Sequence, residues 1–362
     1  MKKLNFNIPF SDFCWQDFLN CFAAVHVYLA DMPHNEDYVC AEKAGRGCND
    51  CGNCKNSIGN IQNDYYFIFG AVTGCASFLE DYDNTRKNPK DDKLDDVIDF
   101  CMKYAGYDYR VATDNMFAEA KLSLDAGIPV LAQLKEQSSD GPYRILIGYD
   151  DEKRLWDVYT QEQGADEITL TADDIKSLCI ITKKTAPAYT LADGLKNIEK
   201  ALVDADTNGI WTQSIPMFDY WKVLEKLPIE EIKKRFERVK TAAWNFDRCH
   251  NFKSAMDCLI NHPTYRESLR TMNLSEDKLR RCAQLGADIE RVYHSSHELQ
   301  WAVISLYDCR HFTKKEMDPV EAGMCECARI IIRQLAQNDR DVLEAVRELI
   351  KELSEFPLII ND

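Results

Sequence analysis

The sequence lacks the features that mark membrane, secreted and nucleic-acid-binding proteins. No stretch reaches the roughly 18 apolar residues needed to span a bilayer. The first residues, MKKLNFNIPFSDF, have no apolar run after their lysines, so we expect no signal peptide. Basic residues are few, with 44 Lys and Arg against 60 Asp and Glu, and the formal charge is −16. Because phosphate-binding surfaces need clustered Lys and Arg, we expect a cytoplasmic protein without nucleic-acid or membrane partners.

The motifs of several large enzyme classes are also missing. The chain has no Gly-rich phosphate loop, no G-x-S-x-G elbow and no H-E-x-x-H pair, and it contains no internal repeat or low-complexity tract. Its composition is ordinary for a globular protein, with 45% hydrophobic and 29% charged residues. This composition excludes wholesale disorder. A length of 362 residues predicts two domains, with a third as the alternative.

The apolar pattern predicts a mixed first half. Ser11 can cap a helix whose apolar side chains recur at three- and four-residue spacing as far as Leu29. Further helices are expected at 64–79, 94–105 and 115–126, and strands at 128–134, 143–149, 155–160, 167–170 and 178–182. Several helices followed by several antiparallel strands indicate an α+β fold.

The second half has helical periodicity throughout. We expect about six helices in a bundle, with breaks near Gly209, Pro228, Pro263, Leu274, Pro319 and Asn338. The segment KKTAPAYT, residues 183–190, is typical of an exposed linker that proteases cut. The sequence therefore predicts an α+β domain over 1–185 and a helical domain over 190–362.

A cysteine-rich insertion at 38–60 is the sharpest local signal. The chain has 15 cysteines, and in a reducing compartment these are thiols or metal ligands. Cys48, Cys51 and Cys54 form two C-x-x-C steps that bring three thiolates together, and Cys40 could supply a fourth. Four thiolates suit tetrahedral Zn²⁺, so we predict a structural zinc site. An iron–sulfur cluster and free thiols in a loop are the alternatives.

Cys14 is a candidate nucleophile at the start of the first expected helix. A helix N-terminus stabilises a thiolate through its unpaired backbone N–H groups. Gln16 could donate a hydrogen bond to an oxyanion. Cys21 lies two turns further on the apolar face, and we interpret it as a small buried hydrophobe. For Cys14 itself, a catalytic and a purely structural role both remain open.

A cysteine at a helix start, more helices and then the segments GIPVLAQL and GPYRILIGYDDEKRLWDVY resemble the papain-like fold. The resemblance is closest to the amino-terminal domain of the butirosin biosynthesis protein H family, and it extends to the peptidase domains of bacteriocin exporters. It covers about residues 8 to 183. It implies that Cys14 sits at the nucleophile of the family, and a helical carboxy-terminal region also occurs in butirosin-H-like proteins.

The sequence departs from the family at the catalytic histidine. The resemblance implies a histidine six residues before Gly148, where this chain has Pro142. The family's acid or amide should follow on the next strand, where Asp157 is the nearest candidate. A cysteine without a general base keeps a thiol pKa of about 8.5. The resemblance therefore implies a papain-like scaffold without its catalytic histidine.

Three functions follow as hypotheses. The first is a catalytically degenerate relative that binds a small molecule or a peptidyl or acyl group beside Cys14. The second is an active acyltransferase or peptidase in which a helical-domain histidine serves Cys14 as base. The third is a regulatory or interaction protein organised by zinc. A polar stripe of Glu290, His294, His297 and Glu298 on one expected helix is interpreted as a solvated face.

Overall fold

The computed structural model describes residues 1–8, 17–32, 61–74, 91–138, 141–159, 168–203, 259–260, 269, 274–308 and 319–354. The chain divides into two compact units. The first unit comprises Met1–Phe69 and Ile98–Tyr189, and the second comprises Gly70–Val97 and Thr190–Asp362.

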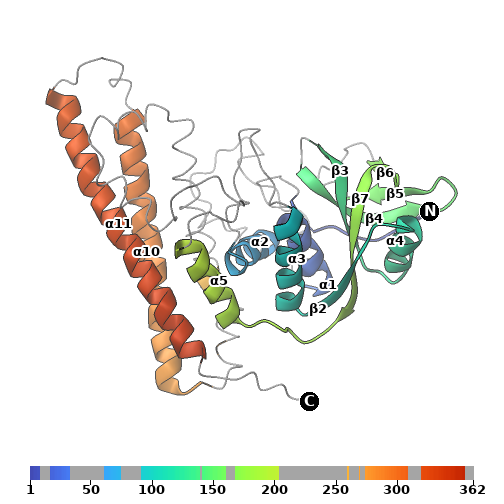
Figure 1. The fold of residues 1–362 in the computed structure, drawn as a ribbon, viewed down its shortest axis with the longest axis horizontal. Coiled ribbons are helices and arrows are strands. Elements are labelled where there is room, and N and C mark those ends of the chain that lie inside the picture. Colours follow the sequence, from blue (N-terminus) through green and yellow to red (C-terminus); the bar gives the residue numbers. More distant parts are fainter. Residues whose placement is uncertain are drawn as a thin grey trace. The chain divides into compact units, whose positions relative to one another are not determined.

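The first unit contains a seven-stranded antiparallel sheet (Figure 1). The strand order is β2-β7-β3-β4-β5-β6, and β1 pairs with β4. The strands are β1 (Lys2–Lys3), β2 (Tyr107–Ala112), β3 (Val130–Ser138), β4 (Gly141–Asp150), β5 (Leu155–Val158), β6 (Thr169–Leu170) and β7 (Ile175–Lys184). Together with the helices this confirms the predicted α+β class.

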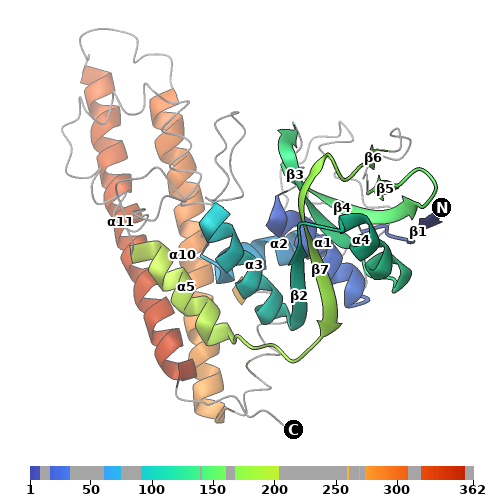
Figure 2. The same cartoon turned by 45° about the vertical axis from the view of Figure 1, so that its right-hand side comes forward.

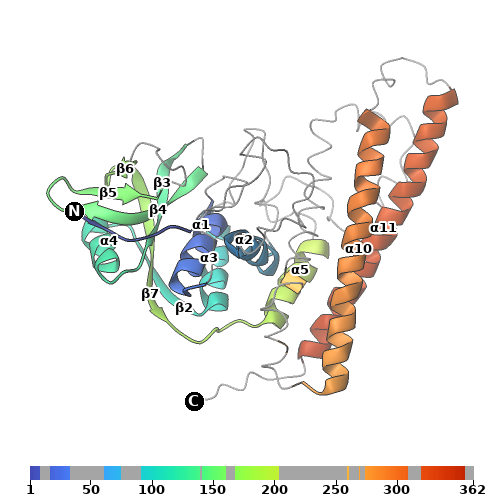
Figure 3. The same ribbon diagram turned by 180° about the vertical axis from the view of Figure 1, so that it is seen from behind.

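Helices cover both faces of the sheet. The helices that contribute to the first unit are α1 (Phe18–Leu29), α2 (Ile61–Val72), α3 (Asp91–Ala105) and α4 (Met116–Asp125). Figure 3 shows α1 on one face and α4 on the other. Under α4, Phe117, Leu124 and Trp156 belong to one apolar core. Every residue of α1 from 18 to 27 is buried, as expected for a helix that is apolar nearly all round.

The first helix begins later than predicted. Asp17 has an extended backbone, with φ −83° and ψ 178°, and its Oδ1 accepts a hydrogen bond from the Asn20 N–H at 2.8 Å. Asp17 is therefore the N-cap and α1 starts at Phe18. The prediction that Ser11 caps this helix is wrong, because the carboxylate of Asp17 satisfies the first-turn amide instead.

Two other boundaries differ from the expectations. The helix expected over 64–79 ends at Val72, and Gly74 follows with φ 70° in the left-handed region, where only glycine is unstrained. Strand β2 was not predicted. Gly106, with φ 77°, separates α3 from β2, so helix and strand follow each other with one residue between them.

The second unit is helical where it is described, as predicted. Its helices are α5 (Leu191–Val203), α10 (Glu276–Asp308) and α11 (Pro319–Ser354). Figure 2 shows α10 and α11 side by side. Helices begin close to Leu274 and at Pro319, but the predicted break at Asn338 is wrong. Asn338 lies inside α11, where its Nδ2 donates to Ser296 Oγ of α10 at 3.0 Å. None of the helices within the described ranges is long and apolar enough to cross a bilayer.

Candidate functional site

Most of the predicted site residues lie outside the described residues. These are the candidate nucleophile Cys14, its neighbour Gln16, and the four candidate metal ligands Cys40, Cys48, Cys51 and Cys54. Within the part of the chain that the structure describes, no group of three or more His, Cys, Asp or Glu residues could hold a metal ion. The structure does describe Asp157, Pro142 and the start of α1, whose N-cap Asp17 follows Gln16 in the sequence.

The start of α1 packs against the start of β4. The Phe18 ring meets the Tyr143 ring edge-on, with 5.7 Å between centroids and an interplanar angle of 69°. Pro142 immediately precedes Tyr143 on β4. The strand position at which the resemblance implies a histidine is thus next to a residue that contacts the first turn of α1. Proline has neither a titratable group nor a backbone N–H, so it supplies no base there.

A buried polar network joins the first turn of α1 to α2. Asp17 Oδ2 accepts a hydrogen bond from the Tyr66 hydroxyl at 3.2 Å. The Gln62 amide donates to Asn20 Oδ1 at 2.5 Å and to the Asn20 carbonyl at 3.1 Å. All four side chains are buried. These hydrogen bonds join the first turn of α1 to α2, while Gln62 Oε1 is buried without a hydrogen-bond partner among the described residues. This network was not predictable from the apolar pattern, because its polar side chains come from two helices far apart in the sequence.

Cys21 lies within this region and is not a nucleophile. It is fully buried, and burial, with a smaller contribution from the negative charge of Asp17, raises the pKa of its thiol well above the ordinary value. The Arg144 guanidinium acts in the opposite direction. Arg144 is itself buried, and it donates to the carbonyls of Gly141 and Tyr143 at 3.2 and 2.6 Å. The interpretation of Cys21 as a small buried hydrophobe is confirmed.

His26 is the one histidine in the described part of the first unit. Its ring lies among aromatic side chains, with Tyr65 and Phe69 at 4.7 and 5.4 Å between centroids. Its Nδ1 lies 3.0 Å from the Tyr107 hydroxyl. Burial, together with the positive charge of Lys184, lowers the pKa of His26 to about 3. This imidazole is therefore neutral at physiological pH and belongs to the core.

Asp157 lies on β5 opposite Gly148 of β4. It is buried, and a Cβ at Gly148 would come within 2.7 Å of Asp157 Oδ2, so only glycine leaves room for this carboxylate. Gly148 is six residues along β4 from Pro142, a separation of about 20 Å at the rise of an antiparallel strand. The register therefore separates Asp157 from the position at which the family's histidine is expected.

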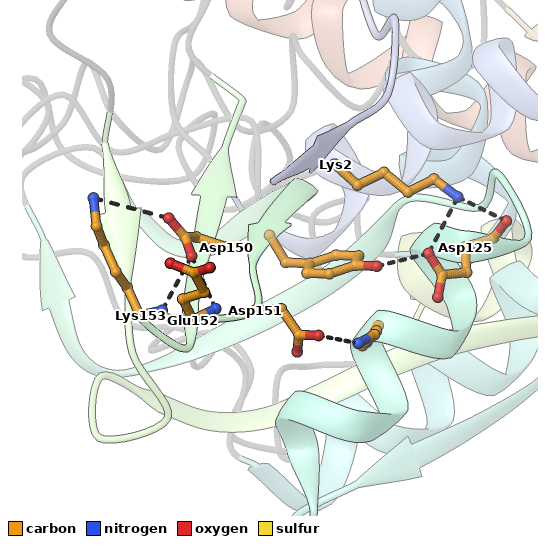
Figure 4. A network of polar contacts seen from close by, with 8 residues as sticks. Lys2, Asp125, Asp150, Asp151, Glu152 and Lys153 are labelled. Atoms are coloured by element: carbon orange, nitrogen blue, oxygen red, sulfur yellow. Dashed lines mark hydrogen bonds and ion pairs between the residues drawn. The ribbon is translucent and has the colours of Figure 1, made fainter.

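Residues 1–8 are here called the N-terminal strap, and their strand β1 runs antiparallel alongside β4. The Leu4 N–H donates to the Ile147 carbonyl at 2.7 Å. Lys2 Nζ donates to the Asp125 carbonyl and Oδ1 at 3.0 and 3.1 Å, and the Tyr149 hydroxyl donates to the same Oδ1 at 2.8 Å (Figure 4). The strap thus enters the sheet beside β4 and leads the chain toward the segment that contains Cys14.

The histidine stripe expected in the second half lies on α10. His294 Nε2 is 3.9 Å from Glu290 Oε1, one helical turn away, and the two side chains are 66% and 42% exposed. This pair fits the interpretation of a solvated helix face.

No protein-family model matches the chain, and no curated protein resembles it at a significant level.

Proposed function

We propose that this chain is a catalytically degenerate relative of papain-like proteins, similar to the butirosin-H kind, that binds a small molecule or a peptidyl or acyl group beside Cys14. One observation carries the proposal: the first turn of α1 lies against the start of β4, through the contact of Phe18 with Tyr143. A papain-like scaffold needs this juxtaposition, because it brings a cysteine near the start of a helix toward a histidine on the strand.

The loss of catalysis rests on the missing base. Pro142 occupies the strand position expected for histidine, and His26 is a neutral core residue. The helix macrodipole favours a thiolate by about 0.3–1 kcal/mol and only within the first turn. Cys14 precedes the N-cap Asp17 by three residues, so little of this effect reaches it. We therefore expect Cys14 to have an ordinary thiol pKa and the protein to have no peptidase activity on generic substrates.

Restoring the histidine tests the proposal. In Pro142→His, the new imidazole should pair with Cys14 and lower its thiol pKa, so alkylation of Cys14 by iodoacetamide at pH 6 should rise about tenfold or more. Pro142→Asn is the matched control, because it makes the same backbone change without a titratable ring. Peptide mass spectrometry gives the rate at Cys14, with the exposed Cys327 as reference.

Two outcomes would contradict the proposal. A folded Pro142→His protein in which Cys14 is alkylated at the wild-type rate would contradict the papain-like arrangement. Selective alkylation of Cys14 at pH 6 in the wild-type protein would instead favour the active acyltransferase or peptidase, with a base supplied by the helical region.

A further inference from the structure

The antiparallel helices α10 and α11 pack along a repeating apolar stripe. Their contacts run in opposite directions along the chain, from Lys278 with Glu352 to Ser296 with Asn338. Buried apolar side chains recur on both helices at spacings of three and four residues, as in a two-helix coiled coil. These are Leu285, Ile289 and Val292 on α10 and Val342, Val346 and Leu349 on α11. Because such a stripe repeats every seven residues, a slide of one heptad matches apolar residues again, so the stripe alone leaves the register open.

The ion pair at the edge of this stripe does not distinguish one register from the next. Arg281 of α10 pairs with Glu348 of α11, and the two side chains are 47% and 41% exposed. The residues seven positions before and after Glu348 are Asp341 and Glu355. After a slide of one heptad in either direction, Arg281 would therefore meet an acidic residue again.

Two other constraints on the register are weak. Lys278 Nζ lies 3.9 Å from Glu352 Oε2, and an ion pair of this length at a partly exposed site contributes little to stability. Residues 309–318 join the two helices. A connection of about ten residues can reach roughly 30 Å, whereas one heptad of helix rises about 10 Å, so the connection permits a slide.

One layer of the helix pair is polar. Asn338 of α11 is buried, and its side-chain amide offers two N–H groups and one carbonyl. Nδ2 donates to Ser296 Oγ at 3.0 Å and to Ser295 Oγ at 3.4 Å, while Oδ1 accepts from the Gln334 amide at 2.9 Å. Ser296 is buried as well. The Asn338 amide is thus fully hydrogen-bonded when the two serines of α10 lie opposite it.

A slide of one heptad would remove the buried acceptor of Asn338. The residues seven positions before and after Ser296 are Ile289 and Val303, which are both apolar. A buried amide that faces an apolar side chain loses its hydrogen bond and is not compensated by water. We propose that Asn338 sets the register of α10 against α11. The polar layer acts as a conformational device that selects one of several arrangements in which the apolar stripes match.

The test locates the register directly in the full-length chain. The photoreactive amino acid p-benzoyl-phenylalanine is placed at position 281, and mass spectrometry identifies the residues of α11 to which it crosslinks. With Asn338 present, the crosslinks should centre on Glu348. In Asn338→Leu, crosslinks centred one heptad away, near Asp341 and Glu355, should rise about fivefold or more. Ser296→Ala removes the acceptor and leaves α11 unchanged, so it should act in the same direction, and it carries the test if Asn338→Leu does not fold.

Gln337→Leu is the matched control on α11. The Gln337 amide donates to Asp341 within the same helix at 2.7 Å, so this substitution removes an amide that does not reach α10. Its crosslinks should stay centred on Glu348. The inference is overturned if the folded Asn338→Leu and Ser296→Ala proteins keep this single centre, if Gln337→Leu shifts it equally, or if the protein with Asn338 already shows crosslinks in both registers.

Discussion

A neutral histidine in the core makes the first unit sensitive to acid. His26 has a pKa of about 3 in the folded protein, against an ordinary value of 6.5. Between these two values the unfolded chain binds a proton that the folded chain does not. The free energy of unfolding therefore falls as the pH falls through this window, by up to about 1.4 kcal/mol per pH unit. Well above pH 6.5 this group contributes no pH dependence.

Replacing His26 should flatten this dependence. We expect His26→Phe to be less stable than the wild type at pH 7, because Tyr107 loses its hydrogen-bond partner. On going from pH 7 to pH 5, the free energy of unfolding should fall about 1–2 kcal/mol less in the variant than in the wild type. Urea unfolding followed by circular dichroism measures both slopes. His294→Phe is the control at an exposed histidine and should keep the wild-type slope. Equal slopes in all three proteins would contradict the assignment of a neutral, buried His26.

The role of a single residue was predictable where it depends only on whether the side chain is buried. Cys21 falls on an apolar helix face, and the structure buries it. The helix cap was not predictable, because Ser11 and Asp17 are both good N-cap residues and both precede the apolar run of this helix. The contact of Asp17 with Tyr66 distinguishes them, and that contact joins parts of the chain 49 residues apart. Local patterns carry no information about such a partner.

At the scale of elements, the expected linker at 183–190 is held on the first unit. Lys183 and Lys184 belong to β7 and pair with β2. The Thr185 N–H donates to the Gly106 carbonyl at 2.8 Å, and the Tyr189 ring stacks on Phe100 at 4.6 Å. Proteases need an extended, detached segment, so we expect trypsin to cut slowly after Lys184 in the native protein.

Gly106→Ala should speed this cleavage. A Cβ at Gly106 would lie 2.6 Å from the Thr185 carbonyl, so the segment would have to move away from α3. Gly127→Ala is the matched control: both glycines have φ near +80°, at 77° and 81°, but a Cβ at Gly127 meets nothing within 4 Å. We expect cleavage after Lys184 to rise about tenfold in the first variant only. Equal cleavage rates in both variants would show that backbone strain at positive φ, and not the contact with the Thr185 carbonyl, makes the segment accessible to trypsin.

Helices and strands were predictable where one periodicity of apolar residues continues for several residues. The predicted strands at 143–149 and 178–182 lie inside β4 and β7, and the predicted helix at 115–126 matches α4. Strand β2 was missed because six residues of mixed polarity, YDYRVA, show no clean alternation. Its burial explains that pattern, because only Tyr107 and Ala112, at the two ends of the strand, are buried.

For the whole molecule, the cysteine content predicts bound metal. Cys21, Cys179 and Cys327 are free thiols. The four candidate zinc ligands lie outside the described residues, so the zinc site stays a prediction. We expect elemental analysis to find about one zinc per chain, since four thiolates complete one tetrahedral site.

Cys51→Ser should lose this zinc and expose residues 40–60 to protease, because a polar loop without a core depends on its metal for order. Cys327→Ser is the control at an exposed thiol and should keep the metal. A brown protein absorbing near 400 nm would indicate an iron–sulfur cluster instead of zinc. Metal-free wild-type protein with a protease-resistant loop would contradict the prediction of a metal site.

The position of β7 in the sheet has a consequence for synthesis. In the described part of the chain β7 is the last strand, yet it lies between β2 and β3 and pairs with both. Among the strands described, β2 has no other partner. On the ribosome, the edges of β2 and β3 that will receive β7 therefore stay open until residue 184 has emerged. Open strand edges pair readily with other chains. The nascent protein is most prone to aggregate just before its first unit is complete, and a chaperone at the exit tunnel has most to shield at that length.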